Sequence, residues 1–173
     1  MLFVIITIFT PISGAHFNPA VTLFFSLRGE ISLKDSVIYI LMHIIGGIIG
    51  VWLTHFMFDL PILQTSETMH RTGSAQWGSE IIATLGLLLT INGGLKSRPE
   101  SVPMLVALYI TGAYWFTSST SFANPAVTLA RGLSNTFAGI YPAHVLMFIS
   151  MQLIGVLVSI KLCHILFSDR RSG

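Results

Sequence analysis

Charged residues and cysteine are both scarce in this chain of 173 residues. Charged residues make up 9% of the sequence and hydrophobic residues 53%, whereas soluble globular proteins carry about 25% charged residues. The single cysteine, Cys163, excludes an intramolecular disulfide framework. A formal net charge of +2 is too small to predict nucleic-acid binding. The scarcity of charge therefore predicts an integral membrane protein.

The residue patterns of an enzyme are also missing. We find no carboxylate pair, no nucleophile with a base, no glycine-rich phosphate loop and no ligands at metal-binding spacing. The sequence therefore predicts no catalytic residue, no metal site and no cofactor.

Four apolar segments are predicted to cross the membrane as helices: 37–57, 77–95, 102–119 and 143–167. Each approaches the roughly 20 residues that a helix needs to span the apolar core of a bilayer. Residues 1–12 are apolar as well, but a helix of that length reaches only about 18 Å and cannot span the core.

The hexapeptide Asn-Pro-Ala-Val-Thr-Leu occurs twice, at residues 18–23 and 124–129. Asn is a good N-cap, and Pro is favoured at the first position of a helix. Each copy is therefore predicted to start a short helix, over 18–27 and 124–132, that reaches about half-way through the bilayer core. The residues of the two motifs are Asn18, Pro19, Ala20, Asn124, Pro125 and Ala126.

The two copies divide the chain into an incomplete first repeat, 1–58, a loop, 59–76, and a second repeat, 77–173. We aligned the two repeats on their motifs. The first repeat then has no segment equivalent to 77–95, and the segment equivalent to 102–119 lacks its beginning. We therefore expect an N-terminally truncated chain, in which residues 1–12 are the remnant of a second helix. The expected fold is an all-α membrane protein, an inverted repeat with two re-entrant half-helices and no first spanning helix.

Basic residues predict the orientation of this fold. If four spanning helices alternate with two re-entrant half-helices, Arg71 and Arg131 lie on one side of the membrane. The other side carries Arg28, Lys34, Lys96, Arg98, Arg170 and Arg171. The positive-inside rule then places the C-terminus in the cytoplasm, in a multi-pass protein of the cell membrane. The two half-helices point their N-termini at each other near the midplane.

Three side chains are predicted to support the pore loops: His16, Glu80 and Thr84. Glu80 and Thr84 lie one turn apart on a predicted spanning helix, and an acid at membrane depth is by default a functional candidate. We interpret Glu80 as structural, since a buried carboxylate can accept hydrogen bonds from the exposed N–H groups of a re-entrant loop.

Two pairs of small residues, Gly46 with Gly50 and Gly155 with Ser159, recur at corresponding places of segments 37–57 and 143–167. Such pairs let helix backbones approach closely in lipid. His43 precedes the first pair, and we expect it to hydrogen-bond between helices.

Two helix N-termini that face each other bring two partial positive charges, about half an elementary charge each. The amides of Asn18 and Asn124 can donate to the oxygen of a passing molecule. A neutral hydroxylated solute can exchange its water hydrogen bonds for these donors, whereas cations and protons meet an electrostatic barrier. This arrangement predicts a passive channel for small neutral hydroxylated solutes.

The segment from Ser13 to Thr22, together with the second Asn-Pro-Ala motif, resembles the major intrinsic protein (aquaporin) family over the whole chain. The barrier described above is the known basis of selectivity in aquaporin-type pores. The resemblance implies six spanning helices plus two half-helices, one pore per subunit and a homotetramer of complete chains. It also implies that the acid of the fourth helix, here Glu80, braces the second pore loop.

In that family four side chains near the outer mouth form the narrowest point of the pore. The resemblance places three of them at Gly112, Ser121 and Val127, and the fourth before the start of the chain. The family usually has Arg where this chain has Val127. We therefore expect a wide, uncharged constriction and a broad solute pore. Arg131, one turn beyond Val127, has two interpretations: it lends positive potential to the outer mouth, or it reaches to the membrane interface, and we favour the second.

The run 114–128 is similar to bacterial aquaglyceroporins of arsenic-resistance clusters, which also carry Val after the second motif. This resemblance implies arsenous acid, a neutral trihydroxide, as a solute beside glycerol-like molecules and water. Two alternatives stay open: a truncated, non-conducting membrane subunit, and a secondary transporter with broken helices. The second is disfavoured because no other titratable group accompanies Glu80. Small neutral solutes and lipid are the predicted partners.

Overall fold

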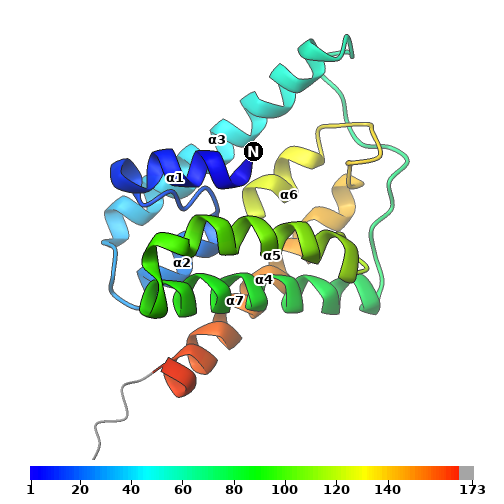
Figure 1. The fold of residues 1–173 in the computed structure, drawn as a ribbon. Coiled ribbons are helices and arrows are strands. Elements are labelled where there is room, and N and C mark those ends of the chain that lie inside the picture. Colours follow the sequence, from blue (N-terminus) through cyan, green and yellow to red (C-terminus); the bar gives the residue numbers. More distant parts are fainter. Residues whose placement is uncertain (168–173) are drawn as a thin grey trace, which may run out of the picture.

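The computed structural model describes residues 1–167 as a set of helices joined by loops (Figure 1). Arg170 and Arg171 lie outside the described residues. Within residues 1–167 there is no strand, and the predicted all-helical fold class is confirmed. The elements in order are α1 (Leu2–Ser13), α2 (Pro19–Leu27), α3 (Leu33–Met57), α4 (Ser74–Ser97), the 3₁₀ helix η1 (Pro99–Ser101), α5 (Val102–Phe116), α6 (Pro125–Arg131) and α7 (Pro142–Phe167).

Three of these helices, α3, α4 and α7, are long and apolar enough to cross a membrane. Many large hydrophobic side chains on α3 and α7 are exposed, as expected of surfaces that face lipid. α5 has 15 residues and is shorter than the predicted segment, because the helix ends at Phe116 and Thr117 takes an extended backbone (φ −103°, ψ 139°). The hydroxyl-rich residues that follow enter the loop before α6.

The two half-helices begin as the sequence predicts. Asn18 and Asn124 have extended backbones, with φ of −155° and −157°, and act as N-caps of α2 and α6. The side-chain oxygen of Asn18 accepts from the N–H of Ala20 at 2.9 Å. Proline occupies the first position of each helix, where its missing N–H costs nothing.

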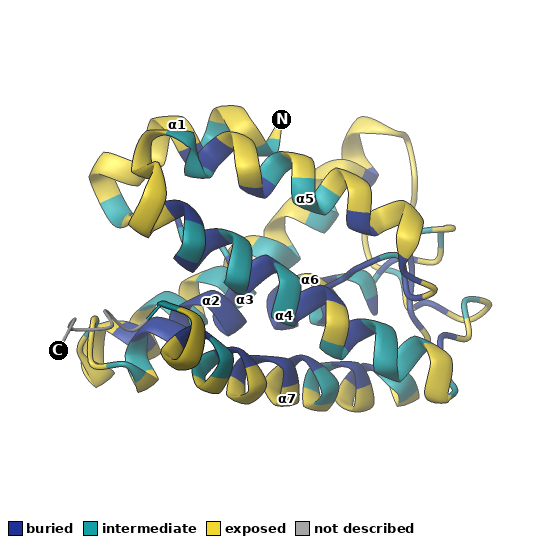
Figure 2. Ribbon diagram, turned by 60° about the horizontal axis from the view of Figure 1, so that its bottom comes forward, coloured by how far each residue is buried: buried dark blue, intermediate teal, exposed yellow. Residues whose placement is uncertain are grey.

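The most extensive helix contact among the described elements is between α4 and α7. A Cβ atom added at Gly155 would lie 2.9 Å from Cβ of Thr84 and 3.0 Å from the carbonyl oxygen of Ile81. Gly155 and Ser159 are both buried, whereas the opposite side of α7 is exposed (Figure 2). The predicted close approach therefore holds for the small-residue pair of α7.

The corresponding pair on α3 has no such neighbour. A Cβ at Gly46 or Gly50 would meet no atom within 4 Å. The expected hydrogen bond of His43 is also wrong, because its Nδ1 atom is buried and has no partner among residues 1–167. At Gly46 and Gly50, α3 therefore has no closely packed neighbour in the part of the chain that the structure describes.

These two glycine environments predict opposite outcomes for the same substitution. Gly155→Ala should destabilise the protein by about 1–3 kcal/mol, because the added methyl group forces α4 and α7 apart. Gly50→Ala is the matched control and should be neutral or stabilising by up to about 1 kcal/mol, since alanine is the better helix former. Thermal unfolding of the two variants in detergent measures both effects. Equal stabilities would contradict the close packing of α7 on α4.

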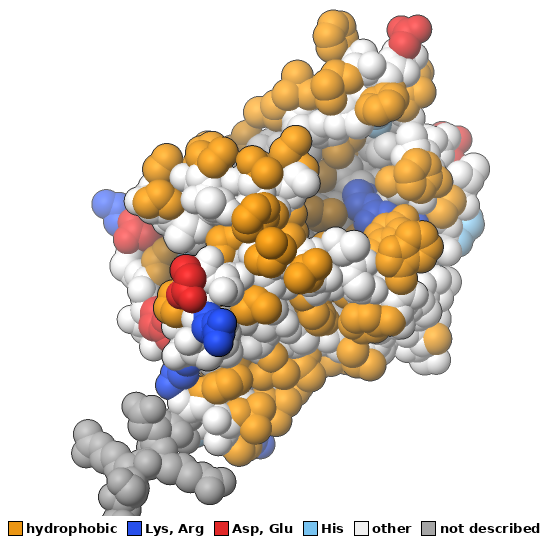
Figure 3. Space-filling model, in the orientation of Figure 1, with side chains coloured by type: hydrophobic (Ala, Val, Ile, Leu, Met, Phe, Trp, Pro, Cys, Tyr) orange, Lys and Arg blue, Asp and Glu red, His pale blue; other side chains and the backbone are white. Residues whose placement is uncertain are grey.

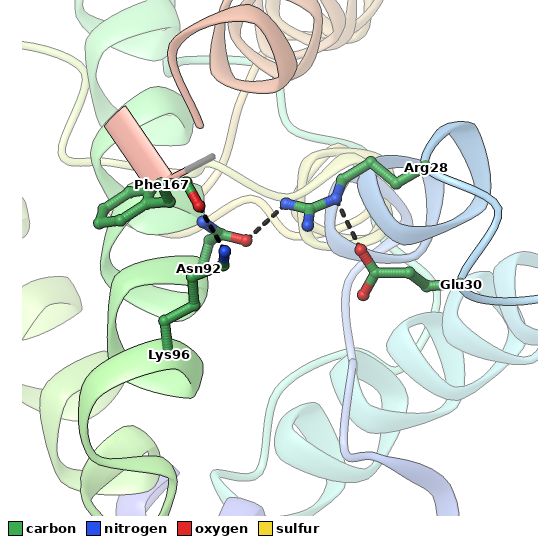
Figure 4. Close-up of polar contacts among 5 residues, drawn as sticks. All are labelled: Arg28, Glu30, Asn92, Lys96 and Phe167. Carbon is green, nitrogen blue, oxygen red and sulfur yellow. Dashed lines mark hydrogen bonds and ion pairs between the residues drawn. The ribbon is translucent and has the colours of Figure 1, made fainter. Parts of the chain in front are cut away.

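A polar cluster joins the ends of three helices at one end of the molecule (Figure 4). Arg28, after α2, pairs with Glu30 at 2.6 Å and donates to the side-chain oxygen of Asn92 on α4 at 2.5 Å. Lys96 of α4 donates to the carbonyl oxygen of Phe167 at the end of α7. This end carries basic residues that the charge pattern predicts to be cytoplasmic.

Candidate functional site

The tips of α2 and α6 meet inside the bundle through reciprocal hydrogen bonds. The side-chain Nδ2 of Asn18 donates to the carbonyl oxygen of Ala123 at 2.7 Å. The Nδ2 of Asn124 donates to the carbonyl oxygen of Phe17 at 3.0 Å. An amide nitrogen carries two hydrogens, so each Asn keeps one donor beyond this contact.

The loops that lead into the two tips repeat the same unusual backbone. Ala15 and Phe17 precede α2 with φ of 49° and 47°, and Ser121 and Ala123 precede α6 with φ of 49° and 46°. Left-handed conformations are strained for residues with a side chain, and such strain gathers at functional sites. This strain could not be predicted from the sequence, because no glycine marks these positions.

Glu80 of α4 holds the second of these loops. Its Oε1 accepts from the N–H of Phe122 and its Oε2 from the N–H of Ala123, both at 2.9 Å. Oε2 also accepts from Nε2 of Gln152 at 2.6 Å, and the same nitrogen lies 2.9 Å from the hydroxyl of Thr128 on α6. Glu80 and Gln152 are fully buried. They join α4, α7, α6 and the loop in one network.

The other two predicted supporting residues are placed differently. Nδ1 of His16 lies 3.0 Å from the hydroxyl of Thr22 on α2, and its ring stacks on Phe25 with centroids 5.1 Å apart. His16 thus contacts the first half-helix. Thr84 is buried against Gly155 of α7, and its hydroxyl has no partner in the described part of the chain. It therefore forms no side-chain hydrogen bond with the pore loop within residues 1–167.

A cavity of about 770 Å³ passes the two tips. One end is bordered by Leu95, Pro99 and Glu100, and the other by Tyr114, Thr120 and Arg131. Asn18 and Asn124 line it between these ends, opposite apolar side chains of α1 and α5. A polar strip along an apolar wall suits the hydrogen-bonding and carbon faces of a small hydroxylated solute.

Two of the three predicted filter residues line this cavity. Ser121 and Val127 border it, and the Val127 side chain is 37% exposed. Gly112 is exposed and is absent from the lining, to which α5 contributes Ile110 and Tyr114 near this end. The structure therefore brings Ser121 and Val127 together with the two Asn residues, but not Gly112.

The favoured interpretation of Arg131 as an interface residue is wrong, and its position agrees with the alternative of a cation at the mouth. Its guanidinium carbon lies 3.6 Å from the centre of the Phe122 ring, and Nε donates to the carbonyl oxygen of Ala138. The side chain borders the cavity. The aromatic ring and the carbonyl hold it inward.

Arg71 lies beside Arg131, although the charge pattern assigns it only to a side of the membrane and to no site. It is buried, its guanidinium carbon lies 5.1 Å from the centre of the same Phe122 ring, and Nε donates to the carbonyl oxygen of Gly139 at 2.8 Å. Burial lowers the pKa of Arg71 from its ordinary value. Its position in a loop of mixed charge offered no sequence signal.

Comparison with known proteins agrees with this geometry. The family model described as "Major intrinsic protein" matches residues 1–114. The chain is 49% identical to "Aquaglyceroporin AqpS" of Rhizobium meliloti (strain 1021) over 171 residues, which cover 99% of this chain and 73% of that protein. It is 33% identical to an aquaglyceroporin of Toxoplasma gondii, covering 78% of this chain and 52% of that protein.

A plant relative, "Probable aquaporin PIP2-8" of Arabidopsis thaliana, is 33% identical over 64% of this chain and 43% of its own length. The chain thus spans between about two fifths and three quarters of the lengths of these relatives. The family resemblance inferred from the sequence is confirmed by the family model and by the near-complete match to the Rhizobium protein. The chain belongs to the major intrinsic protein family, whose members are integral membrane channels and not enzymes.

Proposed function

We propose that the chain forms a passive transmembrane channel for small neutral hydroxylated solutes: water, glycerol-like molecules and arsenous acid. One observation carries the proposal. The reciprocal bonds of Asn18 and Asn124 place two donor amides side by side in a cavity that runs past both half-helix tips. A hydroxylated solute at this point can accept from the remaining N–H of each amide. The aquaglyceroporin relatives support the solute class.

The width of the constriction follows from Ser121 and Val127. Neither side chain carries a charge, and Val127 presents only methyl groups to the cavity. This lining admits solutes larger than water, such as glycerol and the trihydroxide arsenous acid. We also propose that the chain divides into the repeats 1–58 and 77–173. The similar positive φ values in the loops before α2 and α6 support this division.

Val127→Arg tests this assignment. A long cationic side chain at this position narrows the passage and adds a charge one turn from Arg131. We expect glycerol and arsenous acid entry into proteoliposomes to slow by about tenfold, a barrier increase of about 1.4 kcal/mol. Val127→Ile, which stays apolar, is the control and should keep most of the flux. Unchanged glycerol and arsenous acid flux in Val127→Arg would contradict the filter assignment.

The polar ends of the molecule support an orientation for this channel. Arg28 and Lys96 lie together at one end, and Arg71 and Arg131 at the other. We place the first end, with the C-terminus, in the cytoplasm by the positive-inside rule. We also propose a homotetramer in the cell membrane, with one pore per subunit.

A second candidate function is a membrane subunit that does not conduct by itself. A second cavity, of about 560 Å³, lies between α1, α3 and the first loop and shares His16, Phe17 and Val127 with the first. Gly46 of α3 borders it. In such a subunit, two adjoining cavities give a solute no sealed path. The same flux assay separates the two candidates, since only the channel accelerates glycerol entry.

A further inference from the structure

Two arginine side chains converge on one aromatic ring at the predicted outer mouth. Arg131 comes from α6 and Arg71 from the loop between α3 and α4, and both guanidinium groups lie over Phe122. Neither forms an ion pair with a carboxylate in residues 1–167. Figure 3 shows blue, basic side-chain atoms within a hollow of the surface that hydrophobic side chains surround.

The hydrogen bonds of the two side chains differ in a way that matters for binding. Arg71 is tied by all three nitrogens: Nε to Gly139, a terminal nitrogen to the carbonyl oxygen of Phe137 at 3.1 Å, and the other to the hydroxyl of Thr120 at 3.5 Å. Arg131 donates through Nε alone. A guanidinium has five N–H donors. The terminal nitrogens of Arg131 therefore donate to no acceptor in the described chain.

Ser121 is a second polar residue in this region with a side-chain group that lacks a hydrogen-bond partner within residues 1–167. Its side chain borders the same cavity, and its hydroxyl is buried without a partner among the described residues. Glu80, the nearby acid, uses both oxygens for the N–H groups of Phe122 and Ala123 and for Gln152. A buried hydroxyl without a partner is costly. The oxygen acceptors of a ligand would pair with the Ser121 hydroxyl and with the terminal nitrogens of Arg131, which have no partner among the described residues.

We propose that Arg131, with Arg71 and Ser121, forms a binding subsite for small oxyanions in the outer vestibule of the pore. The terminal N–H groups of Arg131 form a fork that matches two oxygens on one atom, as in phosphate or a carboxylate. The Oγ atom of Ser121 is buried in the structure, and once this side chain rotates towards the cavity its hydroxyl donates to a further oxygen. Arg71 adds positive charge, while its own donors fix the loop. The subsite rests on the proposed function, because it lies on the same solute path.

Chemical footprinting of the reconstituted 173-residue chain tests the subsite without any transport. Phenylglyoxal modifies accessible guanidinium groups, and mass spectrometry reads the adduct on each arginine. Inorganic phosphate should slow modification of Arg131 by about tenfold relative to chloride at equal ionic strength, the range expected for charge-assisted hydrogen bonds. Arg98, which is exposed at the opposite end, is the internal control and should react equally in both salts.

Equal reaction of Arg131 in phosphate and chloride would overturn the proposal, and so would equal protection of Arg98. Ser121→Ala removes one donor with little change of shape and should weaken the protection of Arg131 by about threefold. Full protection in this variant would remove Ser121 from the subsite.

Glycerol flux gives a second readout. External phosphate should slow glycerol entry through the natural chain. Inhibition of Arg131→Lys, which keeps the charge but lacks the fork, should need about tenfold more phosphate. Equal inhibition of the natural chain and Arg131→Lys would contradict the proposed fork. Absence of any glycerol flux would refute the proposed channel, while footprinting would still decide the subsite.

Discussion

Glu80→Ala should destabilise the protein by about 3 kcal/mol or more, because it leaves several buried donors without an acceptor. The carboxylate accepts from the N–H groups of Phe122 and Ala123 and from Gln152. Each buried donor left without an acceptor costs about 1–3 kcal/mol. Thermal unfolding in detergent and the amount of folded protein in membranes measure the effect.

Glu67→Gln is the matched control for this prediction. The side chain of Glu67 is exposed, so its neutralisation should change stability by less than about 0.5 kcal/mol. Glu80→Gln should be intermediate, because the amide keeps one acceptor oxygen but turns an N–H donor towards the loop or towards Gln152. If Glu80→Ala were as stable as Glu67→Gln, the loop would be held by something other than this carboxylate.

Asn124→Asp should abolish most glycerol flux. The substitution preserves shape but replaces the Nδ2 donor by an oxygen that faces the carbonyl oxygen of Phe17 across the present 3.0 Å contact. Two acceptors repel one another, and the tip gains a negative charge where the solute needs a donor. We expect a fall of about tenfold or more, from loss of a hydrogen bond and desolvation of the new charge. Stopped-flow light scattering on proteoliposomes measures it.

Asn135 provides the comparison for the same chemical change. Its side-chain oxygen accepts from the N–H of Glu67 at 3.0 Å, and Asp preserves that acceptor. Asn135→Asp should therefore keep both the flux and the stability of the natural chain. A similar loss in both variants would indicate a general response to added charge, and the tip contact would then not explain the effect.

Local sequence rules predicted the half-helices well. Asn before Pro specifies a cap and a first turn within three residues, so the starts of α2 and α6 could be placed without any tertiary information. The hydrogen bonds of Glu80 were also anticipated, since an acid at membrane depth needs donors and a re-entrant loop exposes its backbone N–H groups there.

Features that depend on contacts distant in the sequence could not be predicted in the same way. Arg131 turns into the cavity because Phe122 and the carbonyl of Ala138 hold it there, and spacing along a helix does not reveal either partner. Arg71 contacts Gly139, 68 positions away. The position of Gly112 outside the cavity lining likewise depends on how α5 packs.

In the proposed channel, the two amide tips pass neutral molecules between them and exclude ions. Glycerol entry and ionic conductance, measured on one preparation of the reconstituted chain, test this directly. We expect glycerol entry well above that of empty liposomes, together with no conductance for protons or sodium under an applied potential. Glycerol entry equal to that of empty liposomes, or a cation current that accompanies glycerol entry, would contradict the proposed channel.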